Sequence, residues 1–217
     1  MNTKEITIPL LNNELQGALT IPEEADSIVI FSHGSGSSRK SSRNQMVARL
    51  LQAHHIGTLL FDLLTEDEDR NYLNRFNIDL LTERLIAVTR WVKTNMGISR
   101  LSIGYFGAST GAASALRAAA RLPDIKAVVS RGGRPDMALE VLHKVKAPVL
   151  LIVGSRDIDV LEMNKKAYSH LTCEKQLKLI EGATHLFEEP GTLDKVAEDA
   201  IEWFEKYLVS TNKLTNV

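Results

Sequence analysis

The sequence predicts an α/β domain with a mostly parallel central sheet, helices on both faces and an antiparallel hairpin at one edge. Short apolar runs that end in Gly, Asp or Ser alternate with longer stretches of helical period, which is typical of a parallel sheet covered by helices. The runs are interpreted as successive strands buried on both faces. Residues 5–21 instead alternate in period two around the turn-prone pair Asn12-Asn13, which indicates the hairpin.

These patterns predict the elements in order. The hairpin takes Glu5–Pro9 and Glu14–Ile21. Core strands are expected at Ser27–Ser32, Thr58–Asp62, Leu101–Phe106, Lys126–Ser130, Pro148–Val153 and Gln176–Ile180. Helices are expected around residues 46–51, at 78–92 with Gly97 as C-cap, and at Thr110–Leu122, Asp136–Val145, Asp159–Leu171 and Leu193–Leu208. The charged run Glu66–Arg70 is expected as a solvated loop. One domain should span residues 1–209, followed by a frayed tail at 210–217.

Length, charge and cysteine content exclude several classes of protein. A chain of 217 residues that is 44% hydrophobic can bury a core without disulfides or metal. Its 26 Lys and Arg balance 27 Asp and Glu, so neither nucleic acid nor a membrane is an expected partner. Cys173 is the only cysteine, which excludes an intrachain disulfide. Without a visible secretory signal, we expect a cytoplasmic protein, either monomer or homodimer.

Residues 107–111, Gly-Ala-Ser-Thr-Gly, match the pattern G-x-S-x-G between an expected strand and a helix rich in small residues. A nucleophilic serine must stand at the tip of a tight turn with its hydroxyl exposed. Glycine on either side removes the Cβ that would clash where strand and helix cross. Ser109 is therefore the expected nucleophile. The same glycines do not fit the dinucleotide pattern G-x-G-x-x-G, so a nicotinamide cofactor is not expected.

At this motif the chain resembles the α/β-hydrolase superfamily, and within it the small lidless members grouped with dienelactone hydrolases. The resemblance spans essentially the whole chain. It implies a catalytic triad in the order Ser, acid, His, with the acid after the penultimate core strand and the histidine after the last. Asp157 and His185 occupy these two positions. True dienelactone hydrolases use cysteine as nucleophile, whereas this chain has Ser109.

The chemistry of acyl transfer supports the same three residues. A neutral serine hydroxyl is a weak nucleophile, so a base with a pKa of about 7 must take its proton and a carboxylate must hold the tautomer of that base. The histidines expected on helices or at their ends are His54, His55, His143 and His170. Asp159 and Asp136 are rivals for the acid, although Asp159 is expected to be a helix N-cap.

Acyl transfer also needs donors for the tetrahedral oxyanion. The amide of Thr110, next to the nucleophile, is expected to supply one. In the resembling enzymes the residue after His-Gly supplies the second, which here is Ser35. His33 and Gly34 are expected to shape this loop and to be candidates for substrate contact. The loop is not a phosphate-binding P-loop, because Arg39 stands where that motif needs glycine.

Only 17 residues separate Ser130 from Pro148, which leaves no room for a cap domain and implies an open site. Three arginines are expected near it, Arg39, Arg131 and Arg134. They either bind a substrate carboxylate or form ion pairs within the protein, for example with Asp136.

The expected function is cleavage of small soluble carboxylic esters through an acyl-enzyme on Ser109, with no metal and no organic cofactor. A lactone hydrolase or a thioesterase would use the same triad and differ only in the pocket. A non-catalytic binding protein with this fold is the alternative of another class, since a fold alone does not define a function.

Overall fold

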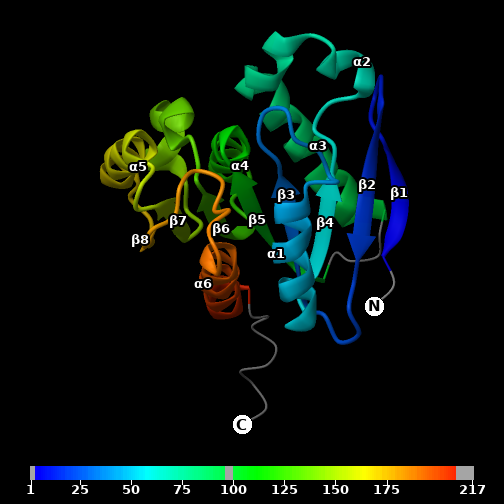
Figure 1. Ribbon diagram of the computed structural model, residues 1–217. Helices are drawn as coiled ribbons and strands as arrows, with labels where there is room; N and C mark the ends of the chain where they lie inside the picture. Colours follow the sequence, from blue (N-terminus) through cyan, green and yellow to red (C-terminus); the bar gives the residue numbers. More distant parts are fainter. Residues whose placement is uncertain (1–2, 96–99, 209–217) are drawn as a thin grey trace.

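The structure is a computed structural model that describes residues 3–95 and 100–208, and its centre is one eight-stranded sheet (Figure 1). The strands are β1 (Lys4–Pro9), β2 (Glu14–Thr20), β3 (Ser27–Ser32), β4 (Gly57–Phe61), β5 (Ser102–Ala108), β6 (Ile125–Arg131), β7 (Val149–Gly154) and β8 (Lys175–Ile180). Their order is β1-β2-β4-β3-β5-β6-β7-β8. β2 pairs antiparallel with β1 and β4, and the other pairs are parallel. The predicted sheet with its antiparallel edge hairpin is confirmed.

Helices cover both faces of the sheet, as the sequence predicts. On one face lie α1 (Ser42–Ala53) and α6 (Thr192–Tyr207), and on the other lie α3 (Ile78–Asn95), α4 (Thr110–Arg121) and α5 (Ile158–His170) (Figure 1). The core strand β3 shows why both faces need a cover. Its Ile28 and Ile30 pack with the second group of helices, whereas Val29 and Phe31 pack with the first. A strand without a polar face can only be buried on both sides.

Two segments differ from the prediction. The charged run forms a short helix, α2 (Glu66–Asp69), because Thr65 and Glu68 make a reciprocal capping box. The segment Pro135–Lys144, η2, is a 3-10 helix where an α-helix was expected. A 3-10 helix rises about 2.0 Å per residue instead of about 1.5 Å, so the same residues span more of the way back to the start of β7.

The carboxyl ends of the parallel strands meet at one edge of the sheet, which we call the carboxyl edge. In Figure 1 this is the upper end, where α2 lies, opposite to the two chain ends. A second 3-10 segment, η1 (Tyr72–Phe76), follows α2. Between β6 and β7 the chain holds only η2, so no cap domain is inserted there.

The expected C-cap Gly97 and the expected tail at 210–217 lie outside the described residues. Of the helices that are described, none combines the length and the apolar character needed to cross a bilayer.

Candidate active site

Ser109 stands at the turn between β5 and α4 with a backbone of φ 51° and ψ −123°. A non-glycine residue in such a conformation costs about 1–3 kcal/mol and persists only where its surroundings hold it. The flanking glycines show how tight the crossing is. A Cβ on Gly107 would lie 2.5 Å from Cα of Ala112, and one on Gly111 would lie 2.1 Å from the carbonyl oxygen of Ser32. The turn therefore requires both glycines and presents Ser109 at its tip.

Asp157 and His185, which are 28 residues apart, meet above the ends of β7 and β8. Nδ1 of His185 lies 2.6 Å from Oδ2 of Asp157. Asp157 is also the N-cap residue of α5, but its side chain makes no capping hydrogen bond because it faces the imidazole. Asp159 lies one position inside the helix and is exposed, so the prediction that it caps α5 was wrong.

The loops that carry these two residues are tied to each other. The amide of Arg156 donates to the carbonyl oxygen of Ala183 at 2.9 Å, and the amide of Gly182 donates to Oγ of Ser155 at 2.8 Å. A Cβ on Gly154 would come within 2.3 Å of the same Ala183 oxygen. This packing fixes the distance between the carboxylate and the imidazole before any ligand binds.

Residues 131–134, which the sequence analysis singled out only for their arginines, connect Ser109 with His185 through their backbone. The amide of Ser109 donates to the carbonyl oxygen of Arg131 at 3.2 Å. The amide of Arg134 donates to the carbonyl oxygen of Ser109 at 3.0 Å. A Cβ on Gly132, which has φ 51°, would lie 3.2 Å from the carbonyl oxygen of His185. The signal in the sequence is the pair Gly132-Gly133 directly after a core strand, where a side chain would push the two loops apart.

The loop after β3 approaches the serine closely. A Cβ on Gly34 would lie 3.0 Å from Cβ of Ser109. The amide of Ser35, a predicted oxyanion donor, donates to Oγ1 of Thr110 at 2.9 Å, and Thr110 is buried. The two predicted donors are thus brought together, and the Thr110 hydroxyl holds the Ser35 amide in place. To bind the Ser35 N–H, an oxyanion must either share it with Oγ1 of Thr110 or take the place of Oγ1 as its acceptor.

We expect Thr110→Val to lower kcat for a nitrophenyl ester by about tenfold, the rate equivalent of about 1.4 kcal/mol. Valine keeps the shape of threonine but removes the acceptor that orients the Ser35 amide. Thr110→Ser, which keeps the hydroxyl, should retain most of the activity and is the matched control. Equal kcat values for the valine variant and the wild type would show that this contact does not orient the loop.

His33 is a structural member of the same loop. Its Nδ1 lies 3.0 Å from the carbonyl oxygen of Gly34, and its Nε2 accepts the amide of Leu63 at 3.0 Å. Because Nε2 accepts, the proton is on Nδ1 and the ring is neutral. Burial lowers the pKa of this histidine. The ring therefore links the loop after β3 to the loop after β4.

The three candidate arginines are all engaged within the protein. Arg134 donates through Nε and Nη2 to the two oxygens of Asp136, each at 2.8 Å, and this contact raises the pKa of Arg134. Arg39 forms an ion pair with Asp62 and its amide donates to the same carboxylate at 2.7 Å. Arg131 is buried and, among the described residues, forms no ion pair.

Arg131 lies beneath the loop of His185 instead of facing solvent. Its Nη2 is 3.3 Å from Oδ1 of Asn44, and its guanidinium lies 5.7 Å from the ring centre of Phe187. Burial, and secondarily the nearby charge of Arg43, lowers the pKa of Arg131 to about 10. Phe187 is fully buried with φ 55°, so this cation–π contact anchors the segment that carries His185.

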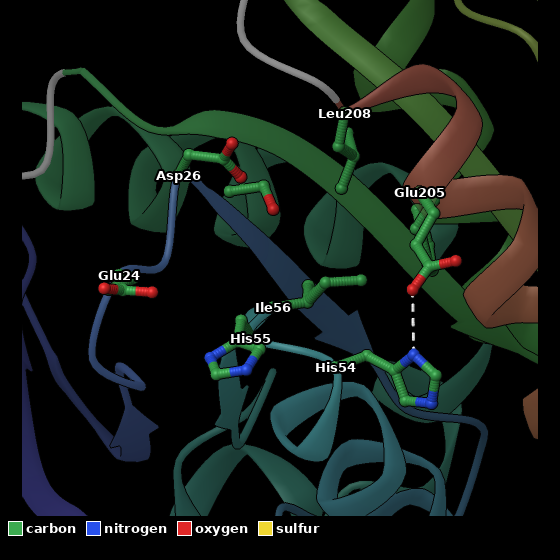
Figure 2. A pocket seen from close by; sticks show the side chains of 9 residues that line it. Glu24, Asp26, His54, His55, Ile56, Glu205 and Leu208 are labelled. Atoms are coloured by element: carbon green, nitrogen blue, oxygen red, sulfur yellow. Dashed lines mark hydrogen bonds and ion pairs between the residues drawn. The ribbon is translucent and has the colours of Figure 1, made fainter. Parts of the chain in front are cut away.

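A separate pocket of about 340 Å³ lies at the amino ends of β3 and β4, at the opposite edge of the sheet from Ser109 (Figure 2). Glu24, His54, His55 and Glu205 line it, and Nδ1 of His54 lies 2.8 Å from Oε1 of Glu205 (Figure 2). Neither histidine is near the predicted triad. Within residues 3–95 and 100–208, no group of three or more His, Cys, Asp or Glu side chains has an arrangement that could hold a metal ion.

The model of the dienelactone hydrolase family matches residues 16–208 of the chain. The chain belongs to this family. A crystal structure of a dienelactone hydrolase from Anabaena variabilis superposes with a TM-score of 0.93 at 49% identity, over 96% of this chain and 99% of that one. The predicted resemblance is confirmed, and this dienelactone hydrolase family member has the α/β-hydrolase fold.

More distant matches carry less information about chemistry. Est1E from Butyrivibrio proteoclasticus has a TM-score of 0.80 at 18% identity, over 93% of this chain and 98% of its own, which shows the fold alone. Two Mycobacterium tuberculosis proteins, named as candidate phosphoribosyl transferases, are 52% identical over 210 residues. The match covers 92% of this family member but only 47% of those proteins, so the chain spans about half the length of these relatives.

Proposed function

We propose that the protein is a serine hydrolase that cleaves carboxylic esters through an acyl-enzyme on Ser109. The observation that carries the proposal is the combination of a serine in a strained turn with the hydrogen-bonded pair of Asp157 and His185. A single strained residue also occurs in structural turns. The strain has a catalytic explanation here because an acid and a base lie on the loops after β7 and β8, at the same edge of the sheet. Ligands of parallel sheets bind at this edge.

In the proposed mechanism, Oγ of Ser109 attacks the ester carbonyl carbon while Nε2 of His185 takes the hydroxyl proton. Asp157 accepts the Nδ1–H of the imidazole, which leaves Nε2 free as the base and stabilises the imidazolium that forms. The oxyanion is bound by the amides of Thr110 and Ser35. His185 then gives the proton to the departing alcohol. In the second half of the reaction His185 takes a proton from water, the resulting hydroxide attacks the acyl carbon, and His185 returns the proton to Oγ of Ser109 as the acid leaves.

A thioester or lactone would use the same residues, so substrate comparison must distinguish them. The transferase name of the Mycobacterium relatives belongs to proteins about twice as long as the matched region, and we propose only hydrolase chemistry for this chain. A cytoplasmic location remains part of the proposal. It is supported by the single cysteine, Cys173, which cannot form an intrachain disulfide.

The proposal is tested by labelling the purified protein with a fluorophosphonate and mapping the adduct by mass spectrometry. We expect one adduct, on Ser109, together with loss of hydrolysis of nitrophenyl butyrate in proportion to labelling. An adduct on another residue would show that this residue, and not Ser109, is the nucleophile. A protein that is neither labelled nor active on esters, thioesters or lactones would instead be the non-catalytic binding protein.

A further inference from the structure

Large apolar side chains are exposed around the candidate active site. In the described part of the chain, the exposed large hydrophobic residues are Leu11, Ile21, Tyr72, Leu73, Phe76, Ile158, Leu179 and Leu186. Six of these eight lie in segments at the carboxyl edge: three in η1, one directly after Asp157, one directly after His185, and Leu11 in the hairpin turn whose Asn13 side chain donates to Glu68 of α2. Exposed apolar side chains that gather in one region mark a binding surface more often than scattered ones do.

The η1 patch, which consists of Tyr72, Leu73 and Phe76, is the larger group. Tyr72 is 63% exposed and Leu73 is 74% exposed. The patch is held in place by Arg75, whose Nε and Nη2 donate to the carboxylate of Asp69 at 2.8 and 2.7 Å. The same guanidinium lies 5.9 Å from the ring centre of Tyr72, and the rings of Tyr72 and Phe76 are 5.2 Å apart. These contacts make a fixed platform of apolar surface.

The η1 patch adjoins the loop that carries the Ser35 amide. A Cβ on Gly36 would lie 3.8 Å from Nη1 of Arg75, and a small pocket between the two segments is lined by both glycines of the loop, Gly34 and Gly36, together with Asp69 and Arg75. Arg75, the side chain that holds the patch in place, thus lies beside the predicted oxyanion loop.

Most arginines at the carboxyl edge form ion pairs within the protein. They are therefore not free to pair with a negatively charged substrate. The ion pairs are Arg39 with Asp62, Arg43 with Glu188, Arg75 with Asp69 and Arg134 with Asp136. Arg131 is buried beneath Phe187. Lys40 and Arg156 are exposed, and a pair formed with a fully solvated cation contributes little. Within the described residues Arg131 forms no ion pair and its buried Nε has no hydrogen-bond partner, but the side chain is buried beneath Phe187 and so is not open to a substrate carboxylate.

The chemistry of the proposed mechanism gives the substrate a direction. His185 must protonate the leaving alcohol, so the alcohol lies on the side of His185, next to Leu186 and Ile158. The carbonyl oxygen faces the Ser35 and Thr110 amides. The acyl chain leaves the carbonyl carbon on the side away from the alcohol, and therefore away from His185.

We propose, on the basis of the proposed function, that the preferred substrates are neutral esters with an apolar acyl chain, and that this chain lies on the η1 patch. Such a preference differs from one for acyl groups that carry a free carboxylate. Apolar contact on an open surface should raise kcat/KM about two- to fourfold for each added methylene, since a fully buried methylene contributes at most about 0.8 kcal/mol.

The test measures kcat/KM for nitrophenyl acetate, butyrate and hexanoate in the wild type and in the double variant Tyr72→Ser, Phe76→Ser. We expect the ratio of hexanoate to acetate to be at least tenfold in the wild type and to fall below about threefold in the variant. Ile21→Ser, at a 37% exposed apolar residue that lies against Gly57 at the opposite edge of the sheet, is the matched control and should keep the wild-type ratio. Nitrophenyl pentanoate should be cleaved at least tenfold better than the glutarate monoester, which has the same chain with a terminal carboxylate.

The proposal is overturned by a flat chain-length series, by an unchanged ratio in the double variant, or by a preference for the glutarate monoester. Size-exclusion chromatography gives a further outcome. If the wild type is a dimer and the double variant is a monomer with the chain-length preference intact, the η1 patch is a contact between copies and the proposal is wrong. Fluorophosphonate labelling of each variant separates these results from failure of the proposed function, because a correct nucleophile is labelled whatever the acyl preference is.

Discussion

Ser109→Ala should lower kcat for nitrophenyl butyrate by about 10⁶-fold, the scale of loss when a triad serine is removed from a serine hydrolase. Without Oγ no acyl-enzyme forms, and only oxyanion binding and substrate positioning remain. The measurement is steady-state kinetics, with fluorophosphonate labelling of the same samples. Ser169→Ala, on the exposed face of α5, is the control and should match the wild type. A loss below about a hundredfold would mean that another group is the nucleophile.

The strained backbone separates loss of chemistry from loss of fold. Alanine at φ 51° carries the same conformational cost as serine, so Ser109→Ala should unfold at nearly the wild-type temperature. Glycine adopts this region without the cost, and Ser109→Gly should therefore be at least as stable as the wild type and equally inactive. A serine that is kept in an unfavourable conformation at the expense of stability is kept for its hydroxyl. If Ser109→Gly were markedly less stable, the turn would not be strained.

The sequence was sufficient to predict that Asp157 and His185 lie side by side. Asp157 and His185 are 28 residues apart, and Ser109 is a further 48 residues before Asp157, yet each lies in the connection that follows a parallel strand: β5, β7 and β8 for Ser109, Asp157 and His185. In a parallel sheet all such positions open on the same edge. Strand ends are readable from apolar runs, so the meeting point follows from the fold without knowledge of any side-chain conformation.

The contacts within that site could not be predicted in the same way. The bond from the Ser35 amide to Thr110 depends on how closely two loops approach, and Gly34 permits this approach only because nothing stands at its Cβ position. For Arg134 the sequence left two roles open, and the nearest carboxylate in the chain, Asp136, decides between them.

Local signals were misleading where two roles compete for one residue. Aspartate before a helix indicates an N-cap, and both Asp157 and Asp159 fit that pattern. Asp157 occupies the N-cap position but uses its side chain for His185. The 3-10 form of η2 was missed for a different reason. Apolar positions three and four apart suit both kinds of helix over so short a segment.

Asp157→Asn should lower kcat by about 10⁴-fold while the fold is kept, the scale seen when a triad carboxylate becomes an amide. The carboxylate accepts the Nδ1–H of His185 at 2.6 Å and so leaves Nε2 unprotonated and able to take the serine proton. An amide can turn its NH2 group toward Nδ1, which places the imidazole proton on Nε2. The imidazole is then the wrong tautomer for a base. The neutral amide also cannot compensate the positive charge that the imidazole gains when it takes the serine proton.

Asp159→Asn is the matched control, because this carboxylate is exposed in the first turn of α5, two residues from Asp157. Both substitutions remove one negative charge near the amino end of the same helix, so their effects on helix stability should be similar and small. Only loss of the contact with His185 distinguishes them. A kcat within twofold of the wild type is therefore expected for Asp159→Asn, and a large loss there with a small one for Asp157→Asn would transfer the role of the acid to Asp159.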